Sequence, residues 1–150
     1  MEIEKEIKQN KSFSSEYQKL VVNIMFTTSW LNAKQSKMFK PYGISPQQYN
    51  ILRILRGQLP NPSSVGLLQD RMIDKMSNAS RLVDKLKLKK LVDRKECKAD
   101  RRQVDIVITD RGLELLKIIN KDVELSENDF KTITVAEAKE LNRILDKLRD

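Results

Sequence analysis

The chain has 150 residues and a mass of 17.5 kDa, which fits one compact domain with or without an oligomerisation extension and excludes two independent catalytic domains. With 33% charged residues, 39% hydrophobic residues and only four glycines and four prolines, the composition favours a helix-rich protein over a disordered or β-rich one. A net charge of +8 and a pI of 9.6 indicate an acidic partner.

The residue types that catalysis and metal binding most often need are scarce. The chain has no histidine, which excludes the common histidine-based metal sites and catalytic triads. Its single cysteine, Cys97, excludes an internal disulfide and agrees with a reducing compartment. There is no paired set of carboxylates, lysines or thiol and no glycine-rich phosphate loop, so we expect no catalysis, no metal and no cofactor.

The hydropathy pattern and the N-terminal segment predict where the protein works. The sequence holds no run of about 18 uncharged apolar residues that could span a membrane. The first eleven residues, MEIEKEIKQNK, lack the apolar core of a signal peptide, and we expect them to be frayed or loosely helical. The sequence therefore predicts a cytoplasmic protein.

A long helix is predicted from Ser14 or Ser15 to the residues before Pro41 and Gly43. Its apolar side chains recur at three- and four-residue steps: Tyr17, Leu20, Val21, Ile24, Met25, Leu31, Met38 and Phe39. About 25 helical residues span about 37 Å, which is more than the core of one small domain needs. We therefore expect part of this face to pack against a second subunit, although an ordinary core stripe would explain part of the pattern.

Two shorter helices are predicted next. The helix from Ile44 to Gly57 has Ser45 as its cap, Pro46 at the first helical position and Gln48 to complete a capping box. After the turn LPNPSS, either of two serines, Ser63 or Ser64, can cap a helix that runs to Met72.

The following helix, predicted from Ser77 to Leu91 with Asp74 or Ser77 as its cap, has two contrasting faces. The inward face is apolar and consists of Ala79, Leu82, Val83, Leu86 and Leu91. The outward face is polar and basic and consists of Asn78, Ser80, Arg81, Asp84, Lys85 and Lys89. As the second helix of a helix-turn-helix, it could read base edges in a DNA major groove. The plainer alternative is a solvated helix face.

Positive charge is concentrated between Lys75 and Arg102. This stretch holds eleven Lys and Arg residues against four acids, a net charge of +7 out of the chain's +8. The remainder of the chain is close to neutral, so the excess charge is local. A patch of this kind is typical of a protein that binds a polyanion.

A β-hairpin is predicted after the basic helix. Residues 91–95 and 104–108 form its strands, around a tip at 96–102 that carries Lys98, Arg101 and Arg102. An arginine at a projecting tip suits a narrow minor groove. Alternatively, Asp100 and one of the arginines brace the hairpin. A basic helix followed by a basic hairpin predicts the winged form of nucleic-acid binding.

Two helices are predicted after the hairpin. Thr109 caps the first, and Thr134 with Glu137 forms a capping box that begins the second. The second carries a narrow apolar stripe: Leu141, Ile144, Leu145 and Leu148. The stripe fits either a core or a dimer interface. Because the long first helix also has an excess of apolar face, we favour the two ends of the chain meeting their counterparts in a dimer.

Three motifs follow one another in the central part of the sequence: RLVDKL in the basic helix, LVDRKECKADRR with its Asp-x-Arg at Asp100 and Arg102, and ITDRGLELL after the hairpin. In this order and spacing they resemble the MarR family of bacterial winged-helix regulators. The resemblance runs from about Ile44 to Ile119, and the flanking helices match in pattern only.

The resemblance implies a mainly α fold with a small β-hairpin wing in a single domain, residues 1–150. A winged helix-turn-helix would occupy 44–109, flanked by dimerisation helices at 12–40 and 110–150. The protein would be a homodimer that binds pseudo-palindromic double-stranded DNA. The DNA-facing residues would be Ser77, Asn78, Ser80, Arg81 and Lys85 in the helix, and Lys98, Asp100, Arg101 and Arg102 in the wing.

Many members of this family are repressors that small aromatic or phenolic ligands release. The candidates for an effector pocket are Tyr17, Met25, Trp30 and Tyr49, each of which also fits a plain core. Peroxide-sensing relatives use a cysteine early in the first helix, which this chain lacks, and we expect Cys97 to be an incidental thiol. The sequence thus predicts a DNA-binding transcriptional regulator; the main alternative is a winged-helix module that binds RNA or an acidic protein.

Overall fold

The computed structural model describes residues 2–96 and 104–150 of the chain. Its elements in chain order are α1 (Ile3–Glu6), α2 (Glu16–Phe39), η1 (Lys40–Tyr42), α3 (Pro46–Gln58), α4 (Val65–Arg71), α5 (Ala79–Leu88), β1 (Val92–Glu96), β2 (Val104–Ile108), α6 (Asp110–Glu127), η2 (Asn128–Phe130) and α7 (Val135–Lys147). The two strands pair antiparallel, with Val92 opposite Ile108. The predicted mainly helical fold with one hairpin is confirmed.

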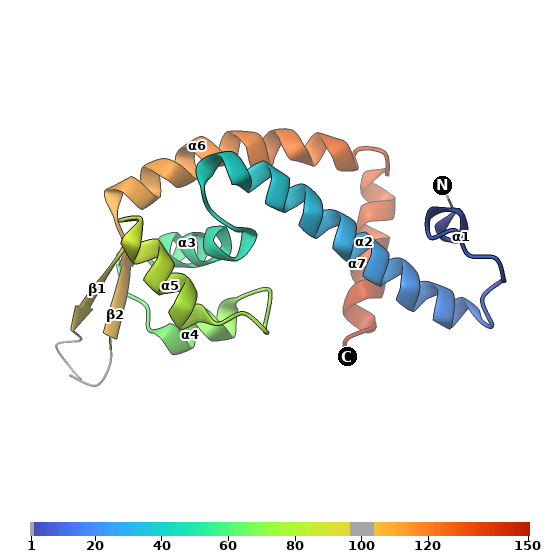
Figure 1. Cartoon of the computed structure of the whole chain (residues 1–150), viewed down its shortest axis with the longest axis horizontal. Helices are drawn as coiled ribbons and strands as arrows, with labels where there is room; N and C mark the ends of the chain where they lie inside the picture. Colours follow the sequence, from blue (N-terminus) through green and yellow to red (C-terminus); the bar gives the residue numbers. More distant parts are fainter. Residues whose placement is uncertain (1, 97–103) are drawn as a thin grey trace.

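The elements divide into a lobe and a set of long helices. Figure 1 shows α3, α4, α5 and the hairpin gathered beneath one end of α6, whereas α2 runs away from them and α7 leaves α6 at the opposite end. We call residues 44–119 the winged lobe. An additional bridge ties the hairpin into this lobe, because Ser63 exchanges two backbone hydrogen bonds with Ile106.

The hydrophobic core lies inside the winged lobe. Its central helix is α3, which packs against α5, α6 and β2. The largest fully buried side chains come from all of these elements and from α4: Ile51, Leu52, Leu68, Met72, Val83, Leu86, Ile106, Leu116 and Ile119. Because each element contributes to one continuous cluster, the core fixes the position of α5 relative to the hairpin.

The helices begin where capping residues allow it. The Ser45 hydroxyl accepts the Gln48 N–H at 3.2 Å, and the Gln48 side chain accepts the Ser45 N–H at 3.1 Å. Thr134 and Glu137 form the same reciprocal capping box at the start of α7. Single side-chain caps, at Ser15, Ser64 and Thr109, begin α2, α4 and α6. These predicted starts are confirmed.

The N-terminal segment takes the helical form of the two that the sequence allowed. It contains the short helix α1, in which Ile3 is buried and Glu4 pairs with Lys19 of α2 at 2.8 Å. This ion pair attaches the segment to α2. Within β2, Ile106 and Ile108 are buried, whereas Val104, at the opposite end of the strand, is 40% exposed.

The apolar faces outside the winged lobe are largely uncovered. Along α2, Tyr17 is 83% exposed and Met25 is 67% exposed. The C-terminal helix α7 has no buried residue, and its stripe leaves Leu141, Ile144 and Leu148 at 43–57% exposure. None of the helices in the described ranges is long and apolar enough to cross a membrane.

Candidate nucleic-acid interface

Helix α5 presents one polar face to solvent because its other face is anchored in the core. Ala79, Val83 and Leu86 are fully buried against α3 and α4. The side chains on the opposite face of the helix are exposed: Ser80, Arg81, Asp84, Lys85 and Leu88. Of the predicted major-groove residues, Ser80, Arg81 and Lys85 thus lie together on one accessible helix face.

Asn78, which was predicted to lie on the outward face, is the residue that caps α5. Its side-chain oxygen accepts the Arg81 N–H at 3.0 Å. The prediction that Asp74 or Ser77 caps this helix is therefore wrong: Asp74 instead accepts the Met76 N–H and the Ser77 hydroxyl within the preceding turn. Asparagine is as good a cap as either, so composition could not choose among three neighbouring candidates. The amide NH₂ of Asn78 stays available as a donor.

The turn before α5 is held by several polar contacts. The Ser77 hydroxyl bonds Asp74 at 2.7 Å, and this hydrogen bond, followed by the Met76 N–H, holds the pKa of Asp74 below its ordinary value. Gln69 of α4 accepts the Ala79 N–H at 3.0 Å. Together these contacts fix where the first turn of α5 sits relative to α4.

Lys89, at the other end of α5, points back into the winged lobe. Its ammonium donates to the Gly43 carbonyl and to the Gln48 side chain, the latter at 3.1 Å. The sequence had placed Lys89 on the outward face with the other bases. It lies instead where it ties the end of α5 to the start of α3, a contact between residues more than 40 positions apart that local periodicity does not reveal.

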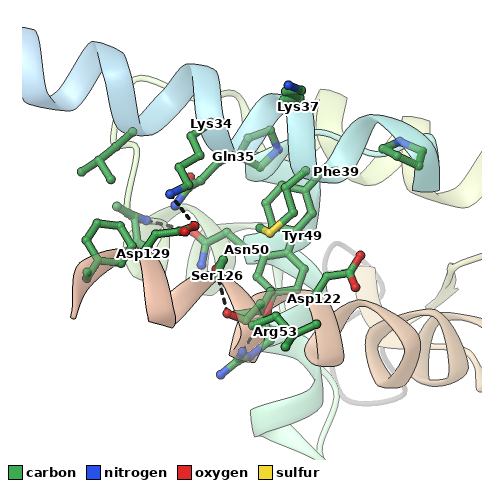
Figure 2. A pocket seen from close by; sticks show the side chains of 18 residues that line it. Lys34, Gln35, Lys37, Phe39, Tyr49, Asn50, Arg53, Asp122, Ser126 and Asp129 are labelled. Atoms are coloured by element: carbon green, nitrogen blue, oxygen red, sulfur yellow. Dashed lines mark hydrogen bonds and ion pairs between the residues drawn. The ribbon is translucent and has the colours of Figure 1, made fainter. Parts of the chain in front are cut away.

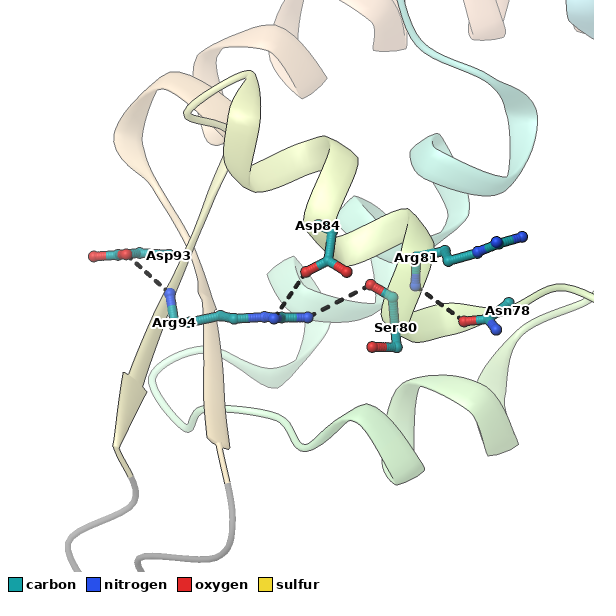
Figure 3. A network of polar contacts seen from close by, with 6 residues as sticks. All are labelled: Asn78, Ser80, Arg81, Asp84, Asp93 and Arg94. Carbon is teal, nitrogen blue, oxygen red and sulfur yellow. Dashed lines mark hydrogen bonds and ion pairs between the residues drawn. The ribbon is translucent and has the colours of Figure 1, made fainter.

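The hairpin and α5 are joined by an ion pair that the sequence did not predict. Arg94 of β1 reaches across to α5, where its Nη1 lies 2.8 Å from Asp84 Oδ1 (Figure 3). Arg94 Nη2 also faces the Ser80 carbonyl at 3.5 Å. The one available signal was an acid on an otherwise basic helix face. The predicted wing residues Lys98, Asp100, Arg101 and Arg102 lie outside the described residues, as does Cys97.

A cavity of about 840 Å³ lies between α2, α3 and α6, beside the winged lobe (Figure 2). We call it the α2–α3–α6 cavity. Its apolar wall includes Met38, Phe39 and Tyr49, and the rings of Phe39 and Tyr49 stack with 4.5 Å between their centroids. Phe130 of η2 also lines it. Of the four predicted pocket residues, Tyr49 lines this cavity. The other three lie on exposed positions of α2: Tyr17, Met25 and Trp30.

Charged groups that line the cavity come from α2, α3 and η2. Lys34 pairs with Asp129 at 2.6 Å, and its ammonium lies 5.1 Å from the Trp30 ring centroid and 5.2 Å from that of Phe130. Arg53 of α3 donates to the Tyr49 hydroxyl at 2.9 Å. Sequence reasoning missed these residues, because α2, α3 and η2 converge only in the folded chain.

One residue of the cavity wall also contacts the turn that leads to α5. Asn50 lines the cavity, and its side-chain oxygen accepts the Ile73 N–H at 3.0 Å. Ile73 itself lines the cavity mouth and directly precedes Asp74, which organises the start of α5. Anything that moved Asn50 would therefore act on the turn before the polar helix.

No cluster of potential metal ligands was found within residues 2–96 and 104–150.

Tyr42 of η1 donates a hydrogen bond to Asp122 of α6. This contact, with burial as a second cause, raises the pKa of Tyr42 above its ordinary value. The bond joins the end of α2 to α6 and so lies at the boundary between the winged lobe and the outer helices.

Comparison with known proteins gives a consistent picture. Residues 42–103 match the model of the MarR family. A MarR transcription factor from Planctomyces limnophilus is 30% identical over 90% of this chain and 98% of its own, with a TM-score of 0.68. Two structures share the fold at lower identity. The S. aureus MepR–DNA complex is 17% identical over 91% of this chain and 97% of that one, with a TM-score of 0.76. The organohalide-sensing regulator RdhR-CbdbA1625, bound to 2,4-dichlorophenol, is 18% identical over 94% and 86%, with a TM-score of 0.81. No curated protein matches the chain.

Proposed function

The chain belongs to the MarR family of transcriptional regulators, and from this premise we propose that it is a homodimeric repressor of pseudo-palindromic operators, released by a small aromatic ligand. The observation that carries the proposal is the exposed polar face of α5, presented beside the hairpin by a core that holds both. A relative with the same fold has been solved bound to DNA. The protein acts by binding, without catalysis.

Helix α5 enters the major groove in this proposal. Arg81 and Ser80 reach base edges from the first turn, and the free amide donors of Asn78 add a contact from the cap position. Lys85, one turn further along, neutralises a backbone phosphate. Ser77 contributes from the preceding turn. The predicted DNA-binding residues of the wing are Lys98, Asp100, Arg101 and Arg102, and in this proposal Arg101 or Arg102 enters the adjacent minor groove.

A second copy of the chain covers the outer helices. The uncovered apolar side chains of α2 and α7 support this, because a monomer rarely leaves a continuous apolar surface in water. Residues 12–40 and 110–150 therefore supply the dimer interface, and residues 44–109 the DNA-binding part. Two-fold symmetry then places two copies of α5 in successive major grooves, with half-sites about 34–36 Å apart.

The α2–α3–α6 cavity is the proposed effector site. Its volume of about 840 Å³ suits a small organic ligand, and the rings of Phe39, Tyr49 and Phe130 suit an aromatic one. A relative with the same fold has been solved with 2,4-dichlorophenol. A ligand that competes for the Asn50 amide would loosen the Ile73 turn and disturb the start of α5, which would lower affinity for the operator.

Selection of duplex DNA from a random pool, followed by binding measurements on the winner and on a scrambled duplex across a salt series, tests this function. We expect an inverted repeat with half-sites about one helical turn apart and steep salt dependence. Arg81→Ala should relax base preference at one position per half-site, whereas Lys85→Ala should weaken both duplexes alike. Lys11→Ala, at an exposed lysine of the N-terminal segment, is the matched control. Enrichment of no sequence would overturn the proposal and favour an RNA or acidic-protein partner.

A further inference from the structure

An acidic side chain stands in the middle of the proposed DNA-binding face. Asp84 lies on the outward side of α5 with Ser80, Arg81 and Lys85, and its side chain is 54% exposed. A carboxylate in this position repels the phosphates of a bound duplex. An acid that opposes the main function of its own surface calls for a physical reason.

Arg94 is the counter-ion of this acid, and two contacts to α5 restrict its position. Its guanidinium is held by two residues of α5, the Asp84 carboxylate at 2.8 Å and the Ser80 carbonyl at 3.5 Å (Figure 3). Only 26% of the Arg94 side chain is exposed, and its Nε is buried with no partner among the described residues. The Arg94 side chain therefore lies against α5 and is largely shielded from solvent.

The Asp84–Arg94 pair contributes little to the stability of the fold. One of its partners is about half exposed, so water screens the attraction between the two charges. An Nε with no partner in the part of the chain that the structure describes lowers that contribution further. Its position on the proposed DNA-binding face points to an effect on DNA binding.

We propose that Asp84 and Arg94 form a specificity-determining pair, a role that rests on the proposed DNA-binding function. Asp84 holds the Arg94 guanidinium off the DNA backbone, which removes one phosphate contact that any sequence would satisfy. Arg94 in turn cancels the repulsion that a bare Asp84 would exert on bound DNA. The pair lowers generic affinity, so that base contacts from α5 decide where the protein binds.

Four proteins test this pair: wild type, Asp84→Asn, Arg94→Met and the double variant. Each is titrated with the selected operator and a scrambled duplex across a salt series. Asp84→Asn frees Arg94, so scrambled-duplex affinity rises about tenfold, the salt slope steepens by about 0.9, and the operator-to-scrambled ratio falls. Arg94→Met leaves Asp84 uncompensated and weakens both duplexes by about tenfold. The double variant returns to wild-type affinity and slope.

Glu2→Gln provides a matched control for net charge. Glu2 pairs with Lys5 at 3.5 Å in the N-terminal segment, and its replacement also removes one negative charge, but away from α5 and from the proposed dimer interface. We expect it to leave both duplex affinities unchanged. If Asp84→Asn has no larger effect than Glu2→Gln, the proposal is overturned. The Asp84→Asn result alone decides the question even if Arg94→Met fails to fold.

The remaining outcomes are also decisive. A double variant as weak as Arg94→Met would mean that Arg94 itself contacts phosphate or only braces the hairpin, which contradicts the proposed pair. A wild-type protein that binds no duplex would remove the proposed function, and this inference with it. If wild type binds the operator and the variants bind both duplexes with the affinities of wild type, the proposed role of the pair is overturned and the proposed function is unaffected.

Discussion

The winged lobe buries an apolar core within one chain, whereas the outer helices do not. Inside the lobe, Leu52, Leu116 and Ile106 are fully buried within a single chain. On α7, by contrast, every residue of the apolar stripe retains some exposure, and Leu141 is 50% exposed. The hydrophobic core of the lobe is therefore formed within one chain. The apolar faces of the outer helices become buried only if a partner packs against them. The following changes probe that contrast, from the largest expected effect to the smallest.

Gly112 is the position at which the lobe tolerates least. A Cβ at this residue would lie 2.3 Å from the Leu91 carbonyl oxygen and 2.7 Å from Ile108 Cγ1, both of which are fixed by the core. We expect Gly112→Ala to lower the free energy of unfolding by about 3 kcal/mol because the backbone has to shift. Urea denaturation measures the change.

Gly57 is the matched control for this substitution. It also lies in a helix of the lobe, but a Cβ there meets nothing within 4 Å. Gly57→Ala should be neutral or stabilise by up to about 1 kcal/mol, through helix propensity alone. Equal effects of the two substitutions would mean that the lobe is less closely packed than the contrast requires.

Charges on the α7 stripe should separate assembly from folding of the lobe. Replacing both Leu141 and Ile144 by Asp leaves the lobe core untouched but puts carboxylates into the proposed dimer interface. We expect the dimer dissociation constant to rise at least about 100-fold. Sedimentation velocity across a concentration series measures it. The control is Leu59→Asp, an exposed leucine of the lobe, which should leave dimerisation unaffected.

The hydrogen bond from Tyr42 to Asp122 joins the two regions, and its contribution should depend on pH. Because the pKa of Tyr42 is raised above its ordinary 10.0, the protonated phenol stabilises the fold below about pH 10, and the effect disappears as pH rises through the raised pKa. Tyr42→Phe should cost at most about 1 kcal/mol near neutral pH, since both partners are partly hydrated. Denaturation of both proteins across pH checks this, and a difference that persisted in strong alkali would contradict it.

The smallest effect concerns the first turn of α7. The Thr134 N–H and then its hydroxyl lower the pKa of Glu137, so the capping box stabilises this turn above the ordinary carboxyl pKa of 4.5 and is lost as pH falls through the lowered value. Glu137→Ala should speed amide exchange in residues 135–138 at neutral pH and make no difference in acid. An exposed α6 glutamate, Glu124, replaced by Ala is the control.

Features set by neighbouring residues could be predicted from the sequence, whereas contacts between distant residues could not. The periodicity of α2 and the capping box at Ser45 and Gln48 are set by residues within four positions, so the sequence displays them directly. The cavity brings together α2, α3 and η2, and the Arg94–Asp84 pair spans two elements. No periodicity connects such residues. The prediction of the α5 cap was wrong for another reason. Asp74, Ser77 and Asn78 can all cap a helix, and the burial of Ala79 directly after Asn78 decides among them.

Sedimentation equilibrium of the protein alone and with the selected duplex tests the central claim, that a self-sufficient lobe is paired by outer helices into a DNA-binding dimer. We predict a free dimer at micromolar concentration and two protomers per duplex at saturation. A free monomer that saturates the duplex with one protomer would contradict the account. The exposed faces of α2 and α7 would then need a different partner.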